Sequence, residues 1–305
     1  MEKLRIAVLG AGGIGKYHIR EFRNCGCEVV AILGSSKESS EKTASDLYAS
    51  LGVNVKPYYE IEKLLETEKL DAVSICTPLQ LHELQVRKCL EFGVHVLCEK
   101  PFVLNSLHKN YKSAYELVKL AQKKRRILSV NTQWPAVLPY LSKYADLSSL
   151  RYFSVLMEPG LKGADMLTDH LPHANSILVR LVKSGKMKNI EFSTNASESI
   201  KMGFEYFNKA GKCRVEYLFR FKADRPRAVV FLINEKKFAR EIGKNYEQRF
   251  VCDGNRFSIE DPFSVSIRSF VNAIIGKGKP LISEKEILEN VKLQDKIIKM
   301  YIQSQ

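Results

Sequence analysis

Residues 1–130 alternate short apolar runs with amphipathic stretches. The apolar runs have the length of β-strands and are hydrophobic almost throughout, as is typical of parallel strands covered on both faces. The stretches between them repeat apolar residues at helical spacing, so a doubly wound parallel sheet with helices on both faces is expected. The expected strands are Leu4–Leu9, Glu28–Leu33, Ala72–Cys76, Val94–Cys98 and Ile127–Val130. The expected helices are Ile14–Asn24, Glu38–Leu51, Ile61–Glu66, Leu81–Phe92 and Ser106–Lys123.

After about residue 148 the pattern changes to strands in succession, many of them alternating polar and apolar residues, which is typical of a mostly antiparallel sheet. The expected strands are Arg151–Met157, Ile190–Thr194, Gly203–Phe207, Arg214–Phe221, Ala228–Ile233, Lys237–Ile242 and Glu247–Cys252. The expected helices are Ala164–Lys183, Pro262–Ile275 and Glu284–Ile302. The predicted fold class is α/β: an N-terminal Rossmann domain over residues 1–125, then a C-terminal α+β domain with a mostly antiparallel open sheet over residues 126–305.

The composition is that of a globular protein. Hydrophobic residues make up 45% and charged residues 27% of the 305 residues, and the length suits two domains. The sequence shows neither a secretory signal nor the run of about 18 apolar residues that a membrane span needs. The seven cysteines are scattered, without the spacing of a zinc site or a disulfide framework. We therefore expect a soluble, cytoplasmic protein with no bound metal.

The formal net charge is +14, but Lys and Arg are spread over the whole chain. The densest run is Lys123-Lys124-Arg125-Arg126, and nucleic-acid binders usually concentrate their basic residues more strongly. A lysine-rich surface is the favoured interpretation. A positive field that attracts an anionic cofactor or substrate comes second, and nucleic acid third.

A glycine-rich turn joins the first expected strand to the first expected helix. Gly10, Gly12 and Gly15 occupy the motif positions of GxGxxG, and Gly13 and Ile14 lie between them. In such loops the glycines allow a tight turn, a close approach to pyrophosphate and close packing of the helix on the strand. The helix N-terminus supplies unpaired N–H groups to the phosphates. Because the motif follows a strand and opens a helix, it predicts a dinucleotide site rather than a plain glycine turn.

The end of the second strand indicates which dinucleotide binds. Domains selective for NAD usually carry an acid there for the ribose 2′-hydroxyl, whereas this chain has Ser35, Ser36 and Lys37. Two hydroxyl groups and a lysine suit a 2′-phosphate, so NADP is favoured and NAD remains possible. The alternative interpretation is a solvated turn in which Ser36 caps the next helix.

Two further motifs follow later strands of the first domain. Thr77-Pro78 with His82 comes after the strand expected at 72–76, and Glu99-Lys100-Pro101 after that at 94–98. With the glycine loop and His18, these motifs closely resemble those of the glucose-fructose oxidoreductase / inositol dehydrogenase (Gfo/Idh/MocA) family. Together the motifs assign the cofactor site to Gly10, Gly12, Gly13, Ile14, Gly15, Ser35, Ser36, Lys37, Thr77, Pro78, His82, Glu99 and Lys100. For His18 and His82 a purely structural role is equally consistent, and His95 and His170 are interpreted as structural.

The resemblance also implies a catalytic trio of Lys100, Asp169 and His173. The family carries an Asp-x-x-x-His motif on a helix of its second domain, and Asp169 and His173 match it. The chain departs from the family pattern at Leu171 and Ser176, which puts the substrate in doubt more than the chemistry. In the implied mechanism hydride moves at nicotinamide C4, His173 or Lys100 handles the hydroxyl proton, and Asp169 orients the substrate or the imidazole. Otherwise the Asp and His are a surface pair one helical turn apart.

The resemblance also implies substrate-binding residues, namely Gln133, Trp134, Asp169 and His173. Trp134 is interpreted either as a sugar-stacking platform or as packing between the domains. The expected function is an NAD(P)-dependent dehydrogenase or reductase acting on a secondary alcohol or ketone of a sugar, polyol or related small molecule. A non-catalytic NAD(P)-binding regulator is the alternative, and a reductase of an imine or tetrapyrrole is a third possibility. The family generally forms homodimers or homotetramers through its open sheet, here within about residues 190–252.

Overall fold

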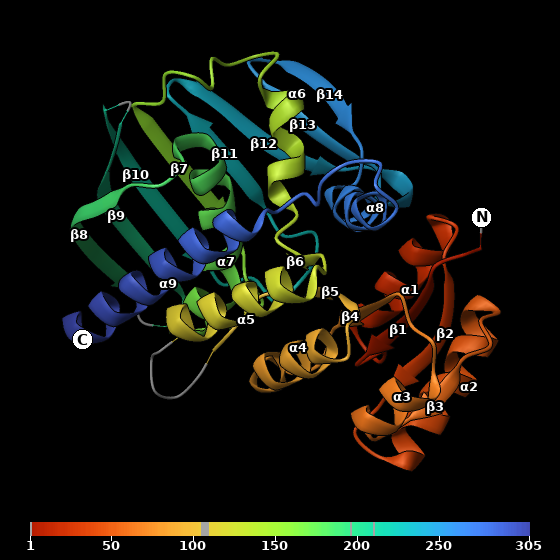
Figure 1. Ribbon diagram of the computed structural model, residues 1–305. Helices are drawn as coiled ribbons and strands as arrows, with labels where there is room; N and C mark the ends of the chain where they lie inside the picture. Colours follow the sequence, from red (N-terminus) through yellow and green to blue (C-terminus); the bar gives the residue numbers. More distant parts are fainter. Residues whose placement is uncertain (1, 105–109, 196, 210) are drawn as a thin grey trace. The chain divides into compact units, whose positions relative to one another are not determined.

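The computed structural model describes residues 2–104, 110–195, 197–209 and 211–305, which form two compact units (Figure 1). The first unit comprises the chain up to Asn131 together with Phe263–Ile287, and the second comprises Thr132–Pro262 and Leu288–Gln305. The first unit thus extends six residues further than the sequence indicated, and a later segment returns to it. The expected helix start at residues 106–109 lies outside the described residues.

The first unit is built on a six-stranded parallel sheet in the order β3-β2-β1-β4-β5-β6, the order of a Rossmann fold. All five expected strands are confirmed; β3 is additional, and its Lys-Pro-Tyr sequence carries no strand pattern. The strands are β1 (Arg5–Leu9), β2 (Glu28–Leu33), β3 (Lys56–Tyr58), β4 (Ala72–Ile75), β5 (His95–Cys98) and β6 (Leu128–Val130). The helices are α1 (Ile14–Asn24), α2 (Lys37–Leu51), α3 (Ile61–Thr67), the 3₁₀ turn η1 (Leu79–Leu81), α4 (His82–Glu91) and α5 (Asn110–Lys124).

Helix α8 (Pro262–Ile274) packs with the first unit although it lies far along the chain. Its buried residues Phe263, Ile267 and Phe270 belong to the same hydrophobic cluster as Ile19 and Phe22 of α1. The amphipathic pattern of 262–275 predicted a helix, but such a pattern does not say which core the apolar face will enter. For this reason the sequence did not reveal that the chain returns to the first unit.

The second unit is built on an eight-stranded sheet in the order β14-β13-β12-β11-β7-β10-β9-β8. Neighbouring strands are antiparallel except β7 and β10, which run parallel, so the expectation of a mostly antiparallel sheet is confirmed. The strands are β7 (Tyr152–Met157), β8 (Lys186–Asn195), β9 (Ser199–Asn208), β10 (Gly211–Arg220), β11 (Val229–Ile233), β12 (Lys236–Ile242), β13 (Gln248–Cys252) and the unexpected β14 (Asn255–Ile259). The helical elements are η2 (Trp134–Val137), α6 (Leu138–Leu141), α7 (Asp165–Val182), η3 (Lys244–Tyr246) and α9 (Glu284–Ser304).

The two faces of the second sheet differ in character. One face carries buried phenylalanines, such as Phe219 and Phe231, which cluster with residues of α7 and α9 (Figure 1). The opposite face carries half-buried side chains, and a row of them crosses five strands in register. We call this the apolar row; its members are Leu218, Leu156, Val230, Ala239 and Val251.

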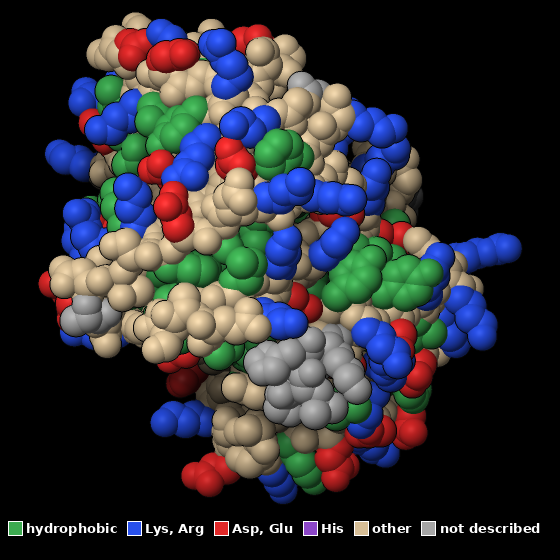
Figure 2. Space-filling view, turned by 90° about the vertical axis from the view of Figure 1, so that its left-hand side faces the viewer, with side chains coloured by type: hydrophobic (Ala, Val, Ile, Leu, Met, Phe, Trp, Pro, Cys, Tyr) green, Lys and Arg blue, Asp and Glu red, His purple; other side chains and the backbone are tan. Residues whose placement is uncertain are grey.

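Basic side chains are dispersed over the surface. On the face drawn in Figure 2 they are interspersed with acidic and hydrophobic side chains rather than gathered into one patch. In the described parts of the chain no helix combines the length and apolar character needed to cross a membrane. The same parts contain no group of three or more His, Cys, Asp or Glu side chains arranged to hold a metal ion.

Candidate functional site

The glycine loop between β1 and α1 needs its glycines for two different reasons. Gly10 has a φ of +83°, and a Cβ added there would lie 2.6 Å from the carbonyl oxygen of Cys76. A Cβ added at Gly15 would lie 2.4 Å from the carbonyl oxygen of Gly10. At Gly12 and Gly13 an added Cβ would meet nothing within 4 Å. The first and third motif glycines therefore serve the backbone, while the middle of the loop faces open space.

The N-terminus of α1 is suited to an anion. Gly13 is its N-cap residue, no side chain caps the helix, and its first turn contains no acid. The first N–H groups and the positive end of the helix dipole are therefore available to a ligand. Together with the open space at Gly12, this arrangement fits the pyrophosphate of a dinucleotide.

The three residues that favour NADP follow β2. Ser36 Oγ accepts a hydrogen bond from the backbone N–H of Ser39 at 3.1 Å, so its interpretation as the cap of α2 is confirmed. The Lys37 side chain is largely exposed, with its Nζ 4.0 Å from Glu41. A serine hydroxyl that accepts a bond in the cap still has its own proton to donate. Ser36 and Lys37 thus retain donors for a 2′-phosphate, and Ser35 precedes them in an exposed turn.

His82 connects the segments that follow β4 and β5. Its Nδ1 lies 2.8 Å from the carbonyl oxygen of Pro101, and its Nε2 lies 2.9 Å from that of Thr77. The hydroxyl of Thr77 donates to Gln85 Oε1 at 2.6 Å, and Pro78 leads into η1. Since the ring of His82 is buried and both nitrogens face backbone carbonyls, it braces the two segments against each other.

His18 and Glu99 form a buried pair beneath the same edge of the sheet. His18 Nε2 lies 2.8 Å from Glu99 Oε1, and its Nδ1 lies 2.8 Å from Ser74 Oγ. Burial disfavours the charged imidazole, but the neighbouring Cys76 and Glu99 outweigh burial and raise the pKa of His18 to about 10. Burial alone would raise the pKa of Glu99, but the hydrogen bond and charge of His18 lower it overall. Asn131 Nδ2 donates to the same oxygen of Glu99, so His18 and Asn131 together hold the Glu99 carboxylate in place.

This pair is expected to make the stability of the protein depend on pH. Because the pKa of His18 is raised in the folded state, its contribution is complete below 6.5 and is lost as the pH rises toward about 10. The contribution of Glu99, whose pKa is lowered, is present above 4.5 and is lost at more acidic pH. Urea unfolding should therefore give a smaller free energy of unfolding at pH 9 than at pH 6. In His18→Gln this difference between the two pH values should be smaller. Equal decreases in the two proteins would contradict this assignment.

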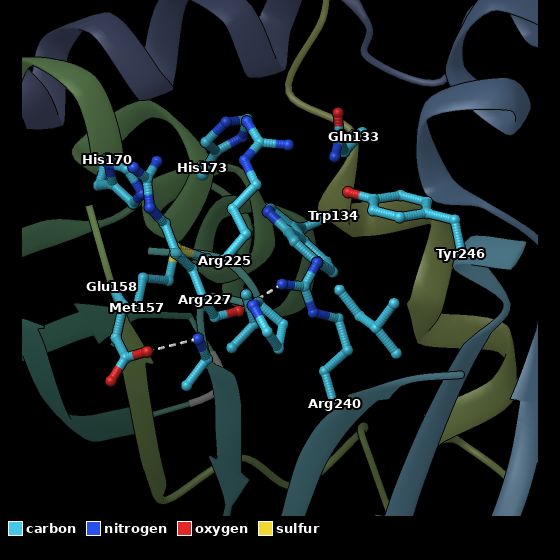
Figure 3. Close-up of a pocket in the computed structure, with 14 residues that line it drawn as sticks. Gln133, Trp134, Met157, Glu158, His170, His173, Arg225, Arg227, Arg240 and Tyr246 are labelled. Atoms are coloured by element: carbon cyan, nitrogen blue, oxygen red, sulfur yellow. Dashed lines mark hydrogen bonds between the residues drawn. The ribbon is translucent and has the colours of Figure 1, made fainter. Parts of the chain in front are cut away.

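The second unit contains a pocket of about 430 Å³ (Figure 3). Its volume lies in the range of about 300–1,000 Å³ that is usual for small-molecule sites. The wall is contributed by η2, β7, α7, β11, β12, η3 and the loop before β11. The lining residues are Gln133, Trp134, Met157, Glu158, His170, His173, Arg225, Pro226, Arg227, Ala228, Val229, Arg240, Ile242 and Tyr246.

The residues of the expected catalytic trio occupy different parts of the chain. Lys100 follows β5 in the first unit, whereas Asp169 and His173 belong to α7 in the second. His173 lines the pocket, and so does His170, which the sequence pattern left as structural. Asp169 Oδ2 lies 2.9 Å from His170 Nδ1, so the carboxylate lies directly beside the neighbouring histidine of the pocket wall. The two imidazole rings are 6.1 Å apart between centroids.

Trp134 is part of the pocket wall but is not an open platform. Only 5% of its surface is exposed, and its ring packs edge-on against Phe231. The guanidinium carbon of Arg240 lies 5.2 Å from the centroid of the same ring. Packing within the second unit therefore accounts for most of this side chain, while Gln133 beside it also lines the pocket.

No sequence pattern indicates the arginines in this pocket. Arg225, Arg227 and Arg240 lie in a loop and a strand of an otherwise basic chain, and no motif distinguishes them from other cations. The Arg225–Pro226 dipeptide, whose peptide bond is cis, is the one local feature that marks the loop. Tyr246 follows Asn245 in a turn where both residues have positive φ, which the sequence also did not indicate.

The first unit has the topology and phosphate loop of a dinucleotide-binding domain, and residues 4–132 match the oxidoreductase family described as having an NAD-binding Rossmann fold. These residues are similar to that family, the Gfo/Idh/MocA oxidoreductases, over less than half of the chain. Inositol 2-dehydrogenase of Corynebacterium glutamicum is 32% identical over 124 residues, which are 40% of this chain and 34% of the relative. The matched part thus spans about a third of the length of that curated relative.

Solved structures resemble the chain over nearly its whole length. UDP-N-acetylglucosamine 3-dehydrogenase of Acidithiobacillus ferrooxidans matches with a TM-score of 0.74 and 18% identity, covering 97% of each chain. Biliverdin reductase of Synechocystis sp., solved with biliverdin and NADP⁺, matches with a TM-score of 0.66 and 17% identity, covering 97% of this chain and 98% of that one. At these identities the likeness establishes the fold of both units and not the substrate.

Proposed function

We propose that the protein is an NAD(P)-dependent oxidoreductase that transfers hydride between nicotinamide C4 and a secondary alcohol or ketone. The substrate class that we propose is a sugar, a polyol or a related small molecule. The observation that carries the proposal is the position of His173 in the wall of a pocket large enough for such a substrate. The match of residues 4–132 to an oxidoreductase family with an NAD-binding Rossmann fold and the name of the inositol 2-dehydrogenase relative support it.

The chain's own residues supply binding and proton transfer. In the oxidation direction His173 accepts the proton of the substrate hydroxyl while hydride leaves the carbon that bears this hydroxyl for nicotinamide C4. In the reduction direction His173 returns the proton to the oxygen. The Lys100 ammonium stabilises the negative charge that develops on the oxygen. Asp169, which is paired with His170, acts on the substrate indirectly by orienting the pocket wall. The nicotinamide, when bound, supplies only the hydride acceptor or donor.

The panel that tests this function is a set of sugars, polyols and keto acids offered with NADP⁺, NAD⁺ and the reduced cofactors. Turnover by absorbance at the nicotinamide band is expected for at least one compound. A mass spectrum of the protein as purified identifies any dinucleotide that is retained. Tight cofactor binding with no turnover across the panel would contradict the catalytic proposal and support a non-catalytic regulator.

NADPH is expected to bind more tightly than NADH, because Ser35, Ser36 and Lys37 stand where selective NAD sites carry an acid. Lys37→Ala should weaken NADPH binding by about 1.5–3 kcal/mol, the contribution of a charged hydrogen bond, and leave NADH nearly unchanged. Calorimetric titration of both cofactors measures this. The matched control is Lys42→Ala, which removes a charge from the same helix away from the turn. Equal or tighter binding of NADH by the unaltered protein would refute the preference.

We further propose that the protein forms a homodimer or homotetramer through the open face of the second sheet. The apolar row leaves five aliphatic side chains half-exposed across β10, β7, β11, β12 and β13, and such faces are usually covered. All of its members except Leu156 lie within residues 190–252. Light scattering at micromolar concentration should give an oligomer, and Leu156→Lys with Leu218→Lys should give the monomer. A monomer without these substitutions would overturn the proposal.

A further inference from the structure

The pocket of the second unit has an unusual balance of charge. Three arginines and two histidines line it, against a single carboxylate, that of Glu158. A pocket built for a neutral sugar is normally lined by uncharged hydrogen-bonding groups with few cations. The excess of guanidinium groups therefore requires an explanation beyond the proposed hydride transfer.

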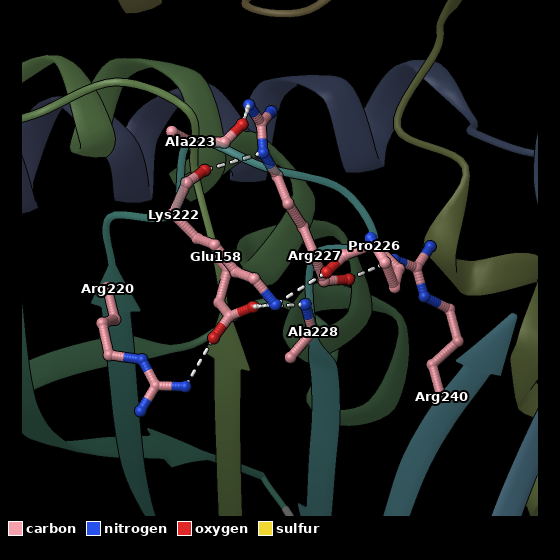
Figure 4. A network of polar contacts seen from close by, with 8 residues as sticks. All are labelled: Glu158, Arg220, Lys222, Ala223, Pro226, Arg227, Ala228 and Arg240. Atoms are coloured by element: carbon pink, nitrogen blue, oxygen red, sulfur yellow. Dashed lines mark hydrogen bonds and ion pairs between the residues drawn. The ribbon is translucent and has the colours of Figure 1, made fainter.

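The one carboxylate of the pocket is already neutralised by residues at the end of β10 and in the loop before β11. Glu158 pairs with Arg220 at 2.5 Å and with Lys222 at 3.4 Å, and it accepts a hydrogen bond from the backbone N–H of Ala228 at 2.7 Å (Figure 4). Burial opposes ionisation of Glu158, but these contacts outweigh it and lower its pKa. Glu158 consequently does not compensate the pocket's arginines.

Of the three arginines, Arg227 has a structural role. Its Nε and its terminal nitrogen donate to the carbonyl oxygens of Lys222 and Ala223, both at 3.0 Å, and so hold the loop before β11 in shape (Figure 4). Its backbone carbonyl in turn accepts a hydrogen bond from Arg240. The loop is therefore a braced element, and it presents Arg225 from a fixed backbone.

Arg225 and Arg240 are the two pocket arginines that this network leaves without a carboxylate in ion-pair contact. Neither forms an ion pair with a carboxylate anywhere in the described chain, and Arg240 uses one of its donors on the carbonyl of Arg227. Burial is the main reason that the pKa of Arg240 is lowered; Tyr246 and Asp261 act against it, and the charge of nearby Arg225 acts with it. Figure 3 shows Arg225 extending toward His173 and Arg240 lying beside Trp134. Two like charges held in one pocket repel each other unless an anion joins them.

We propose that the substrate is an anion, whose carboxylate or phosphate group binds to Arg225 and Arg240 while its reacting hydroxyl faces His173. Guanidinium groups suit this role because their planar donors match both carboxylate and phosphate. This inference rests on the proposed function for the reacting hydroxyl, but the recognition of the anion does not depend on turnover. The expected substrates are acidic sugars, hydroxy acids or sugar phosphates rather than neutral polyols.

The test uses the fluorescence of Trp134, the only tryptophan of the chain, in the full-length protein at constant ionic strength. The probes are glucuronate, gluconate and glucose 6-phosphate, with glucose and inositol as their neutral counterparts. At least one acidic probe should bind about tenfold or more tightly than its neutral counterpart, as expected for charged hydrogen bonds. Comparison of the carboxylates with the phosphate identifies which acid group the site prefers.

Two substitutions link that preference to the arginines. Arg225→Gln and Arg240→Gln should each lower the affinity for the acidic probe by a factor of about ten or more and leave the affinity for neutral sugars unchanged. Arg225 is exposed in its loop, so its replacement should leave the stability of the fold unchanged. For Arg240→Gln, thermal unfolding checks that the variant is still folded. Lys237→Gln is the matched control, because it removes a charge from β12 outside the pocket and should change nothing.

Each outcome decides between the two proposals. If the acidic probe binds and both arginines are needed for its binding, anion recognition is supported. If no turnover is found at the same time, only the hydride-transfer proposal fails. Turnover of neutral sugars with the same kcat/KM in Arg225→Gln overturns anion recognition and leaves the proposed function intact. Equal affinity for acidic and neutral probes by calorimetry, or loss of NADPH affinity instead of acid affinity in the arginine variants, also overturns it.

Discussion

Replacing His173 with alanine is expected to lower kcat by a factor of at least about 100, the usual contribution of a positioned general acid or base. His173 lies in the wall of the pocket proposed to bind the substrate, and it lies outside the glycine loop and the residues after β2. NADPH affinity should therefore stay within a factor of about two. Near-normal turnover of His173→Ala on a working substrate would mean that α7 has only a structural role.

Two further variants separate the proposed contributions of Lys100 and Asp169 from that of His173. Lys100→Met should lower kcat by a comparable factor of about 100, because it removes the charge that we propose stabilises the substrate oxygen. Asp169→Asn should fall between this variant and the unaltered protein, since it keeps the shape of the side chain and a hydrogen bond but loses the charge beside His170. An Asp169→Asn protein as impaired as His173→Ala would instead mean that the carboxylate acts directly on the substrate.

Substituting valine for Gly12 is expected to abolish most of the cofactor affinity without harming the fold. Nothing of the protein lies within 4 Å of a Cβ at this position, so the added side chain fills space in front of α1 and blocks the pyrophosphate. Losing about two charged hydrogen bonds corresponds to a loss in affinity of a factor of about 100 or more. Calorimetry with NADPH and NADH measures the loss, and the unfolding midpoint should stay unchanged.

The matched control for this prediction is Gly10→Ala, which places a smaller group at a position that the backbone itself occupies. Its Cβ would lie 2.6 Å from the carbonyl oxygen of Cys76, at a φ of +83°. Strain and overpacking together should lower the free energy of unfolding by about 2–5 kcal/mol. If Gly12→Val were the less stable of the two variants, the loop would be a packing element rather than a phosphate site.

The sequence predicted most strongly those elements whose pattern is set by local burial. The apolar runs of β1, β2, β4 and β5 are covered on both faces, so their hydrophobic character shows in the sequence whatever their neighbours are. Strand β3 could not be predicted in this way, because Lys56, Pro57 and Tyr58 are held by pairing with β2 rather than by burial. Strand β14 could not be predicted for the same reason, because its residues are mainly exposed and are held by pairing with β13.

The candidate site was predictable only where a motif marks it. The glycine loop, the segment before Pro101 and the Asp-x-x-x-His spacing on α7 are each local in sequence, so they were found. Arg225 and Arg240 reach the same pocket from a loop and from β12, and that meeting depends on the register of the second sheet. The place of His170 in the pocket could not be predicted, because only the fold shows that two histidines of α7 share one wall.

The return of residues 263–287 to the first unit has a consequence for how the chain is made. During synthesis the glycine loop and all six strands of the Rossmann sheet emerge early, but α8, which covers Ile19 and Phe22, follows only after residues 132–262. At about 5–20 residues per second this delay lasts on the order of ten seconds. Throughout that interval the nascent first unit exposes the apolar surface that α8 later buries. A release of the chain before residue 263 therefore leaves a cofactor domain that is complete in its sheet but prone to aggregate.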